Sequence, residues 1–125
     1  MNIFGQEYEF LLTIGASEKI AGLCPDGDMT RIGEMLDAKT ADLFDFFVQF
    51  ILSMSEGSDE NSRFWGKELN HDPLTAEKLR ALSFKELKNI QAEAMKKFKE
   101  DMATTVEVAP PKKEENPPEE GTQKT

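Results

Sequence analysis

The sequence predicts a mainly helical α+β domain with a short N-terminal β-hairpin. Apolar residues alternate with polar ones near the N-terminus, recur at helical spacing further on, and crowd into the stretch LFDFFVQFILSM at residues 43–54. On a helix, the few polar residues of this stretch form one narrow stripe, so the remaining surface is apolar and needs cover from several sides. The stretch is shorter than the roughly 20 apolar residues that cross a bilayer. We therefore expect it to be the central helix of a core or of a shared interface.

The first residues predict the hairpin. Residues 7–14 alternate in polarity as a half-buried strand does. Gly5-Gln6 would form the tight turn that joins this strand to a very short first strand at residues 2–4. A two-stranded hairpin is marginal alone in water, so we expect it to pack on helices or to pair with the edge of another chain.

Helical signals follow the hairpin. A short helix is predicted over residues 16–23, and another after the break at Pro25, near residues 28–36. A longer helix is predicted from residue 84 to 102, because Ser83 and Glu86 match a capping box at its start. This last helix has a narrow apolar stripe, which either docks on the domain and completes its core or pairs with a partner helix.

Composition divides the chain into four parts. These are the hairpin with a helical core (1–55), a polar loop (56–74), the C-terminal helices (75–102) and a tail (103–125). The loop is predicted from its polar residues and from the helix-breaking Gly57 and Gly66. The tail is rich in Pro, Glu and Lys and has almost no apolar side chains, so we expect it to be disordered.

The net charge of −9 and the pI near 4.6 argue against a nucleic-acid partner, because such binding depends on Lys and Arg displacing counterions. An acidic surface instead maintains solubility and speeds encounter with basic partners. The N-terminus lacks the pattern of a signal peptide, and one cysteine allows no internal disulfide. We expect a cytoplasmic protein that does not enter a membrane.

One segment begins like a calcium-binding loop. Asp26-Gly27-Asp28 has the initial spacing, but the sixth position is Arg31, where the sharp turn needs Gly, and the twelfth is Asp37, where Glu is usual. A turn followed by a helix cap explains these residues better. No metal site and no cofactor are predicted.

Catalysis is not predicted either. Cys24 and His71 could form a thiol pair, but no third group that would orient them is identifiable. A lone Cys beside a Pro turn is usually a small core residue, and His71 is expected to be an exposed loop residue. Acidic pairs fit solvated positions on a strand face and a helix stripe: Glu7 with Glu9, and Asp42 with Asp45. The expectation is a non-enzymatic binding protein.

The first half of the chain carries a resemblance. The run from Phe4-Gly5-Gln6-Glu7-Tyr8 to Phe10, then Leu12-Thr13-Ile14-Gly15-Ala16, a second short helix and the aromatic helix Leu43 to Met54 follow one another in order. This order resembles the tail assembly chaperones of long-tailed bacteriophages. In that family a strand pair of the form "Gly, Lys or Gln, Glu, Tyr" leads into "Thr-Ile-Gly-Ala" and then a small helical domain.

The resemblance implies a role without enzymatic activity in the cytoplasm of the infected host. Such chaperones coat the aggregation-prone tape measure protein, help to recruit tail tube subunits, commonly form homo-oligomers and are absent from the finished virion. By carry-over, the partner-binding residues would be Tyr8, Phe10 and Leu12 of the strand, with Phe44, Phe47, Phe50 and Ile51 of the central helix.

A different class of protein remains open. A small acidic regulator, such as an antitoxin or an inhibitor, could mask a basic partner and become ordered on binding. The two hypotheses differ in the force that drives binding. Salt weakens an electrostatic complex and leaves an apolar one largely unaffected.

Overall fold

The structure is a computed structural model that describes the backbone of residues 1–108 and the side chains of residues 1–103. It is mainly helical with a short N-terminal antiparallel hairpin, which confirms the predicted fold class. The elements are β1 (Asn2–Ile3), β2 (Gln6–Glu7), α1 (Ile14–Leu23), η1 (Pro25–Gly27), η2 (Met29–Arg31), α2 (Ile32–Met35), α3 (Thr40–Phe64), α4 (Ala76–Arg80) and α5 (Phe84–Val108). The expected disordered tail lies outside the described residues from position 109 on.

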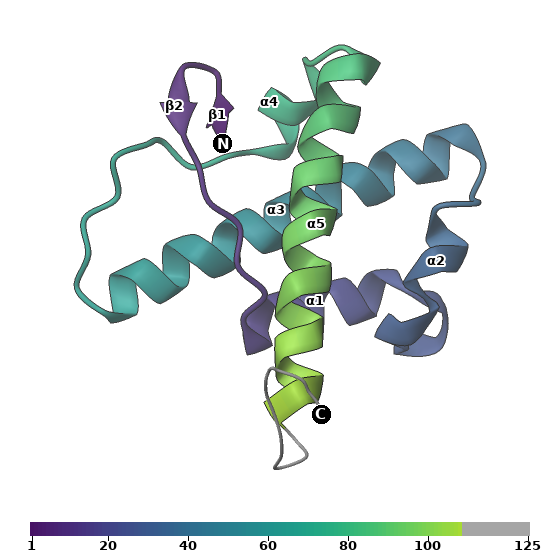
Figure 1. Ribbon diagram of the computed structural model, residues 1–125. Coiled ribbons are helices and arrows are strands. Elements are labelled where there is room, and N and C mark those ends of the chain that lie inside the picture. The colour runs from purple at the N-terminus through teal and green to yellow at the C-terminus, as the bar shows by residue number, and fades with distance from the viewer. Residues whose placement is uncertain (109–125) are drawn as a thin grey trace, which may run out of the picture.

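Two long helices organise the molecule. In Figure 1, α5 crosses the middle of α3, and α1 lies along the side of α3 away from the hairpin. The ring of Phe50 in α3 meets the ring of Phe98 in α5 edge to face, with centroids 5.5 Å apart. The apolar stripe of α5 is buried at Leu87, Ile90, Ala94 and Phe98. Of the two arrangements expected for this helix, the structure therefore shows the one that completes the core.

The hairpin is shorter than predicted. Asn2 pairs with Glu7 and Ile3 with Gln6, and the turn consists of Phe4 and Gly5 rather than Gly5 and Gln6. Both turn residues have positive φ, +56° and +78°, as a tight two-residue hairpin turn requires. Gly supplies this conformation freely, whereas Phe4 adopts it against its own preference.

The predicted strand at residues 7–14 is wrong beyond Glu7. The next backbone groups bond to helices or to the N-terminus instead of a strand: Tyr8 N–H to Met1 O at 2.8 Å, and Leu11 N–H to Met54 O at 3.1 Å. The Leu12 N–H donates to the Asp101 carboxylate of α5 at 3.0 Å. The alternation of apolar and polar residues therefore reflects a segment with one buried face. Its backbone N–H groups bond to the N-terminal residue, a helix carbonyl and a side chain.

The central helix, α3, is much longer than the apolar stretch at residues 43–54 from which it is predicted. The predicted loop at 56–74 is wrong up to Phe64, because α3 continues through Gly57 and ends only at Trp65 and Gly66. Gly66 has φ +75°, the left-handed conformation in which helices commonly end. A Cβ on Gly57 would lie 2.5 Å from the Leu11 carbonyl oxygen, so this glycine marks a close approach of two segments.

The remaining helices differ from prediction mainly at their ends. α1 begins at Ile14, since the Thr13 hydroxyl accepts from the Ala16 N–H and caps it. The helix predicted near 28–36 is two short turns, η2 and α2. α5 begins at Phe84 as predicted and runs past the expected end at residue 102, to Val108. None of the described helices has the length and apolarity needed to span a membrane.

Candidate protein-binding surface

Most of the predicted partner-binding residues lie inside the fold. Tyr8, Phe50 and Ile51 are at most 1% exposed, and Phe10 and Phe47 are also buried. Only Leu12 and Phe44 are half-buried and reach the surface. In this conformation the aromatic helix therefore supplies the protein's own core, and contact with a partner has to use other apolar side chains.

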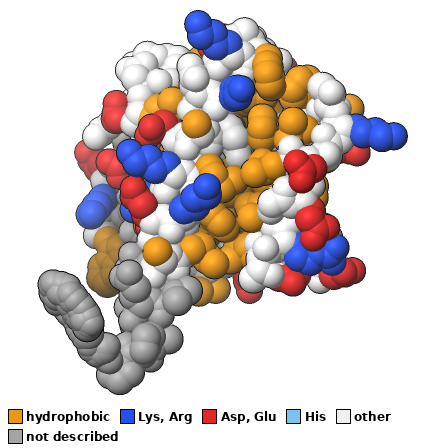
Figure 2. Space-filling model, turned by 45° about the vertical axis from the view of Figure 1, so that its right-hand side comes forward, with side chains coloured by type: hydrophobic (Ala, Val, Ile, Leu, Met, Phe, Trp, Pro, Cys, Tyr) orange, Lys and Arg blue, Asp and Glu red, His pale blue; other side chains and the backbone are white. Residues whose placement is uncertain are grey.

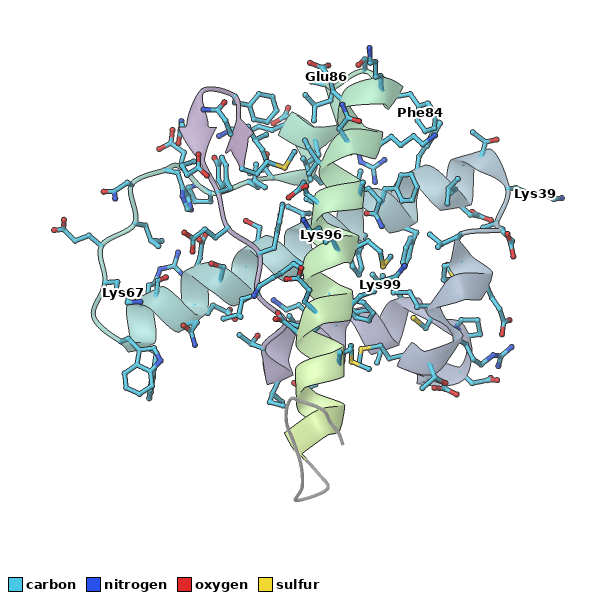
Figure 3. All side chains as sticks on the ribbon, viewed as in Figure 1. Lys39, Lys67, Phe84, Glu86, Lys96 and Lys99 are labelled. Atoms are coloured by element: carbon cyan, nitrogen blue, oxygen red, sulfur yellow. The ribbon has the colours of Figure 1, made fainter. Side chains whose placement is uncertain are left out.

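Phe44 is part of an open apolar pocket. With Val48 of α3 it faces α4 and the start of α5, and the ring centroids of Phe44 and Phe84 lie 5.2 Å apart. The pocket has a volume of ≈ 290 Å³ and is lined by Phe44, Val48, Leu79, Arg80, Leu82, Phe84 and Leu87. Phe84, labelled in Figure 3, is 51% exposed although it is aromatic. We call this site the α3/α4/α5 pocket.

Charged side chains stand at the edge of the pocket. Arg80 donates to Asp45 at 2.7 Å, and both side chains are at least half exposed. The Lys88 amine lies 6.0 Å from the centroid of the Phe84 ring, which is within range of a cation–π contact. The rim thus carries two positive groups and one negative group, although the whole chain is strongly acidic.

A broader apolar surface occupies the same side of the molecule. Figure 2 shows hydrophobic side chains gathered in a hollow between α5 and the part of the chain that contains α2 and the start of α3. Half-buried hydrophobic residues of these elements and of η2 are Met29, Ile32, Met35, Leu43, Met95 and Met102. Four of these six are methionines. We call this surface the Met-rich face.

A second exposed apolar feature lies at the far end of α3. Phe64 and Trp65 are 79% and 68% exposed, and their rings meet edge to face with centroids 5.2 Å apart. Gly66 turns the chain away immediately after them. The two rings therefore project from the end of a long helix as a preformed aromatic pair.

His71 is not the exposed loop residue that the sequence predicts. Its side chain is only 10% exposed and lies between two acceptors, with Nδ1 2.8 Å from the Glu7 carbonyl oxygen and Nε2 2.9 Å from the Asp59 carboxylate. The Tyr8 ring lies against it, with centroids 4.2 Å apart. Burial, with the charges of Asp72 and Asp59, raises the pKa of Tyr8. These contacts fasten the hairpin to α3.

Cys24 lies elsewhere and has a different partner. It is buried, as predicted for a small core residue, and its thiol donates to the Ile20 carbonyl at 3.3 Å. Burial raises the pKa of this thiol, so at neutral pH it is protonated and weakly nucleophilic. The structure does not place it with His71 as a thiol pair.

The acidic residues near residue 30 surround an arginine. Arg31 pairs with Asp26 and with Glu34, the latter through two nitrogens at 2.7 and 2.9 Å. Asp28 caps η2 by accepting from Thr30, and these hydrogen bonds lower the pKa of Asp28. The turn-and-cap interpretation is confirmed for Asp28. Across the described residues, no group of three or more His, Cys, Asp or Glu side chains could hold a metal ion.

The sequence contains local signals for both of these exposed features. Phe64-Trp65 is an isolated aromatic pair in a polar stretch, directly before a glycine. Leu82 and Phe84 lie one residue on either side of a capping serine. Both signals are local, but only the packed structure leaves these side chains open to solvent.

Comparison of the chain with profiles of known protein families, with curated proteins and with solved structures finds no match.

Proposed function

We propose that the protein is a phage tail assembly chaperone that binds apolar helical segments of the tape measure protein and keeps them soluble. The Met-rich face is the observation that supports this proposal. A contiguous apolar surface open to solvent is uncommon in a monomer and marks sites of protein interaction. The order of the N-terminal elements, which resembles this chaperone family, supplies the identity of the partner.

Methionine suits such a role. Its unbranched, polarisable side chain adapts to differently shaped partners, and Met-rich grooves bind amphipathic helices of varied sequence. A long partner with many related apolar helices would need an adaptable surface of this kind. Recruitment of tail tube subunits would follow while the chaperone coats the tape measure protein. The net charge of −9 would keep the complex in solution.

Co-expression with the tape measure protein of the same phage tests the proposal. The wild-type chain should raise the soluble fraction of that partner, and the double variant Met35→Glu, Met102→Glu should lose this effect. Ile14→Glu is the matched control, because Ile14 is 80% exposed at the start of α1, outside the Met-rich face. Circular dichroism must show equal helicity in all three chains. A tape measure protein that precipitates equally with and without the wild-type chain would refute the proposal.

Salt dependence separates this function from that of an acidic regulator. A complex formed through the Met-rich face should keep its affinity between 0.05 and about 1 M salt, where exposed charge pairs are almost fully screened. Loss of the complex over this range would favour masking of a basic partner instead.

A further inference from the structure

One helix carries a projecting aromatic pair at one end and an aromatic-lined opening near the other. Phe64 and Trp65 stand at the C-terminal end of α3, and Phe44 and Val48 line the α3/α4/α5 pocket near its N-terminal end. Exposed aromatic residues lose the free energy that burial would supply, about 1.5–3 kcal/mol for a Phe side chain. Both features are therefore available for a contact that the described part of the chain does not make.

Within the described residues, the aromatic pair and the pocket cannot contact each other. Phe44 and Phe64 are separated by twenty positions of one continuous helix, which corresponds to about 30 Å at 1.5 Å per residue. Residues 109–125 contain no aromatic side chain that could anchor in the pocket. The complementary surface is present on a second copy.

Size and geometry favour an aromatic occupant. The pocket volume of ≈ 290 Å³ is slightly smaller than the range of about 300–1,000 Å³ typical of small-molecule sites, so the pocket suits an occupant the size of a side chain. Its walls include the rings of Phe44 and Phe84, which can receive further rings edge to face. Because Phe64 and Trp65 already contact each other, little conformational freedom is lost when they dock.

Local charge allows two acidic chains to meet here. The residues that flank the aromatic pair in sequence are Glu60, Arg63, Lys67 and Glu68, two of each sign. The pocket rim holds Arg80 and Lys88 against Asp45. Neither surface shares the strong negative charge of the whole chain, so electrostatic repulsion between two copies is weak where these two surfaces meet.

We propose that the Phe64–Trp65 pair of one copy docks into the α3/α4/α5 pocket of a second copy. The two contacting surfaces differ, so the interface is heterologous, and each added copy leaves a free pair at one end and a free pocket at the other. Such assembly proceeds head to tail and either closes into a ring or extends. This inference does not depend on the proposed function.

Sedimentation velocity on the full-length chain tests the contact. The wild-type chain should form species larger than a dimer as concentration rises, and Trp65→Ser and Phe84→Glu should each stay monomeric. An equimolar mixture of the two variants should form a one-to-one dimer, because one retains the pocket and the other retains the aromatic pair. Ile14→Ser, at an exposed apolar site elsewhere, is the control and should assemble like the wild type.

Tryptophan fluorescence gives an independent readout, since Trp65 is the only tryptophan. Its emission should shift to shorter wavelength as wild-type concentration rises, and should not shift in Phe84→Glu. A wild-type chain that stays monomeric with constant emission overturns the proposal. So do assembly that survives in both variants, and an emission shift that appears only when the tape measure protein is added.

Discussion

His71 Nε2 lies 2.9 Å from the Asp59 carboxylate, and the two side chains are only 10% and 8% exposed. A carbonyl oxygen can only accept a hydrogen bond, so the other ring nitrogen, Nδ1, donates to Glu7. One side chain thus joins the end of the hairpin to the middle of α3. The bonds of His71 bring together segments that are 64 and 12 positions away in the sequence.

His71→Ala should lower the free energy of unfolding by about 2–3 kcal/mol, because it leaves a buried carboxylate without its partner. Urea denaturation followed by circular dichroism measures the loss. Lys19→Ala is the control, since Lys19 and Glu56 form an ion pair in which both side chains are 49% exposed. That pair should contribute less than about 1 kcal/mol. Equal effects of the two substitutions would show that the His71 contacts do not stabilise the fold.

The start of α5 depends on a reciprocal cap. Ser83 N–H donates to the Glu86 carboxylate at 2.9 Å, and the Ser83 hydroxyl accepts from Glu86 N–H at 3.2 Å. Ser83→Ala should therefore destabilise the protein by about 1 kcal/mol in chemical denaturation, whereas Ser83→Thr retains the cap and should cost less. A Ser83→Thr variant as unstable as Ser83→Ala would contradict a role of the hydroxyl.

The same cap predicts a pH dependence. The hydrogen bond from the Ser83 backbone, followed by that with the Ser83 side chain, lowers the pKa of Glu86. A carboxyl group whose pKa is lower in the folded state stabilises the fold at neutral pH, and this contribution disappears as the pH falls through that pKa. Wild type should therefore exceed Glu86→Ala in thermal stability at pH 7, and the difference should shrink in acid. A difference that stays constant from pH 7 to about pH 3 would exclude the charge as its source.

Gly57 is required where α3 passes the N-terminal segment. A Cβ there would lie 2.5 Å from the Leu11 carbonyl oxygen, a backbone atom that moves only with its chain. Gly57→Ala should destabilise the protein by about 1–3 kcal/mol, although alanine favours a helix. Gly22→Ala is the matched control, because nothing lies within 4 Å of its added Cβ. It should be neutral or stabilising by up to about 1 kcal/mol.

Cys24 should react slowly with thiol reagents. Burial raises the pKa of its thiol, so both access and the thiolate fraction are reduced at neutral pH. We expect alkylation by iodoacetamide in the native protein to be at least about tenfold slower than in urea, and to accelerate with rising pH. Equal rates in the native and the denatured protein would place the thiol at the surface.

Local signals in the sequence predicted some elements accurately. The start of α5 was predicted because Ser83 and Glu86 are neighbours on one helical turn, and their bonds need no other part of the chain. The aromatic stretch around Phe46 and Phe50 was predicted to occupy the core because so much apolar surface cannot remain in water. Both inferences rest on properties of a single segment.

Other features depended on contacts between distant segments. From the sequence, Gly57 was predicted to break the helix. In the structure it lies inside a continuous helix, and the Leu11 carbonyl oxygen lies so close to it that only a glycine fits. Similarly, His71 was predicted to be an exposed loop residue, but in the structure its ring lies between Glu7 and Asp59.

By itself, the sequence determined the fold class, the capped start of the last helix and the identity of the core, since these follow from helix caps and from the hydrophobic effect within one segment. Only the tertiary structure decided which apolar residues stay outside. Phe47 and Phe64 are the same residue type on one helix, yet one is 7% and the other 79% exposed. Exposure depends on which neighbouring elements cover each position, and no single segment carries that information.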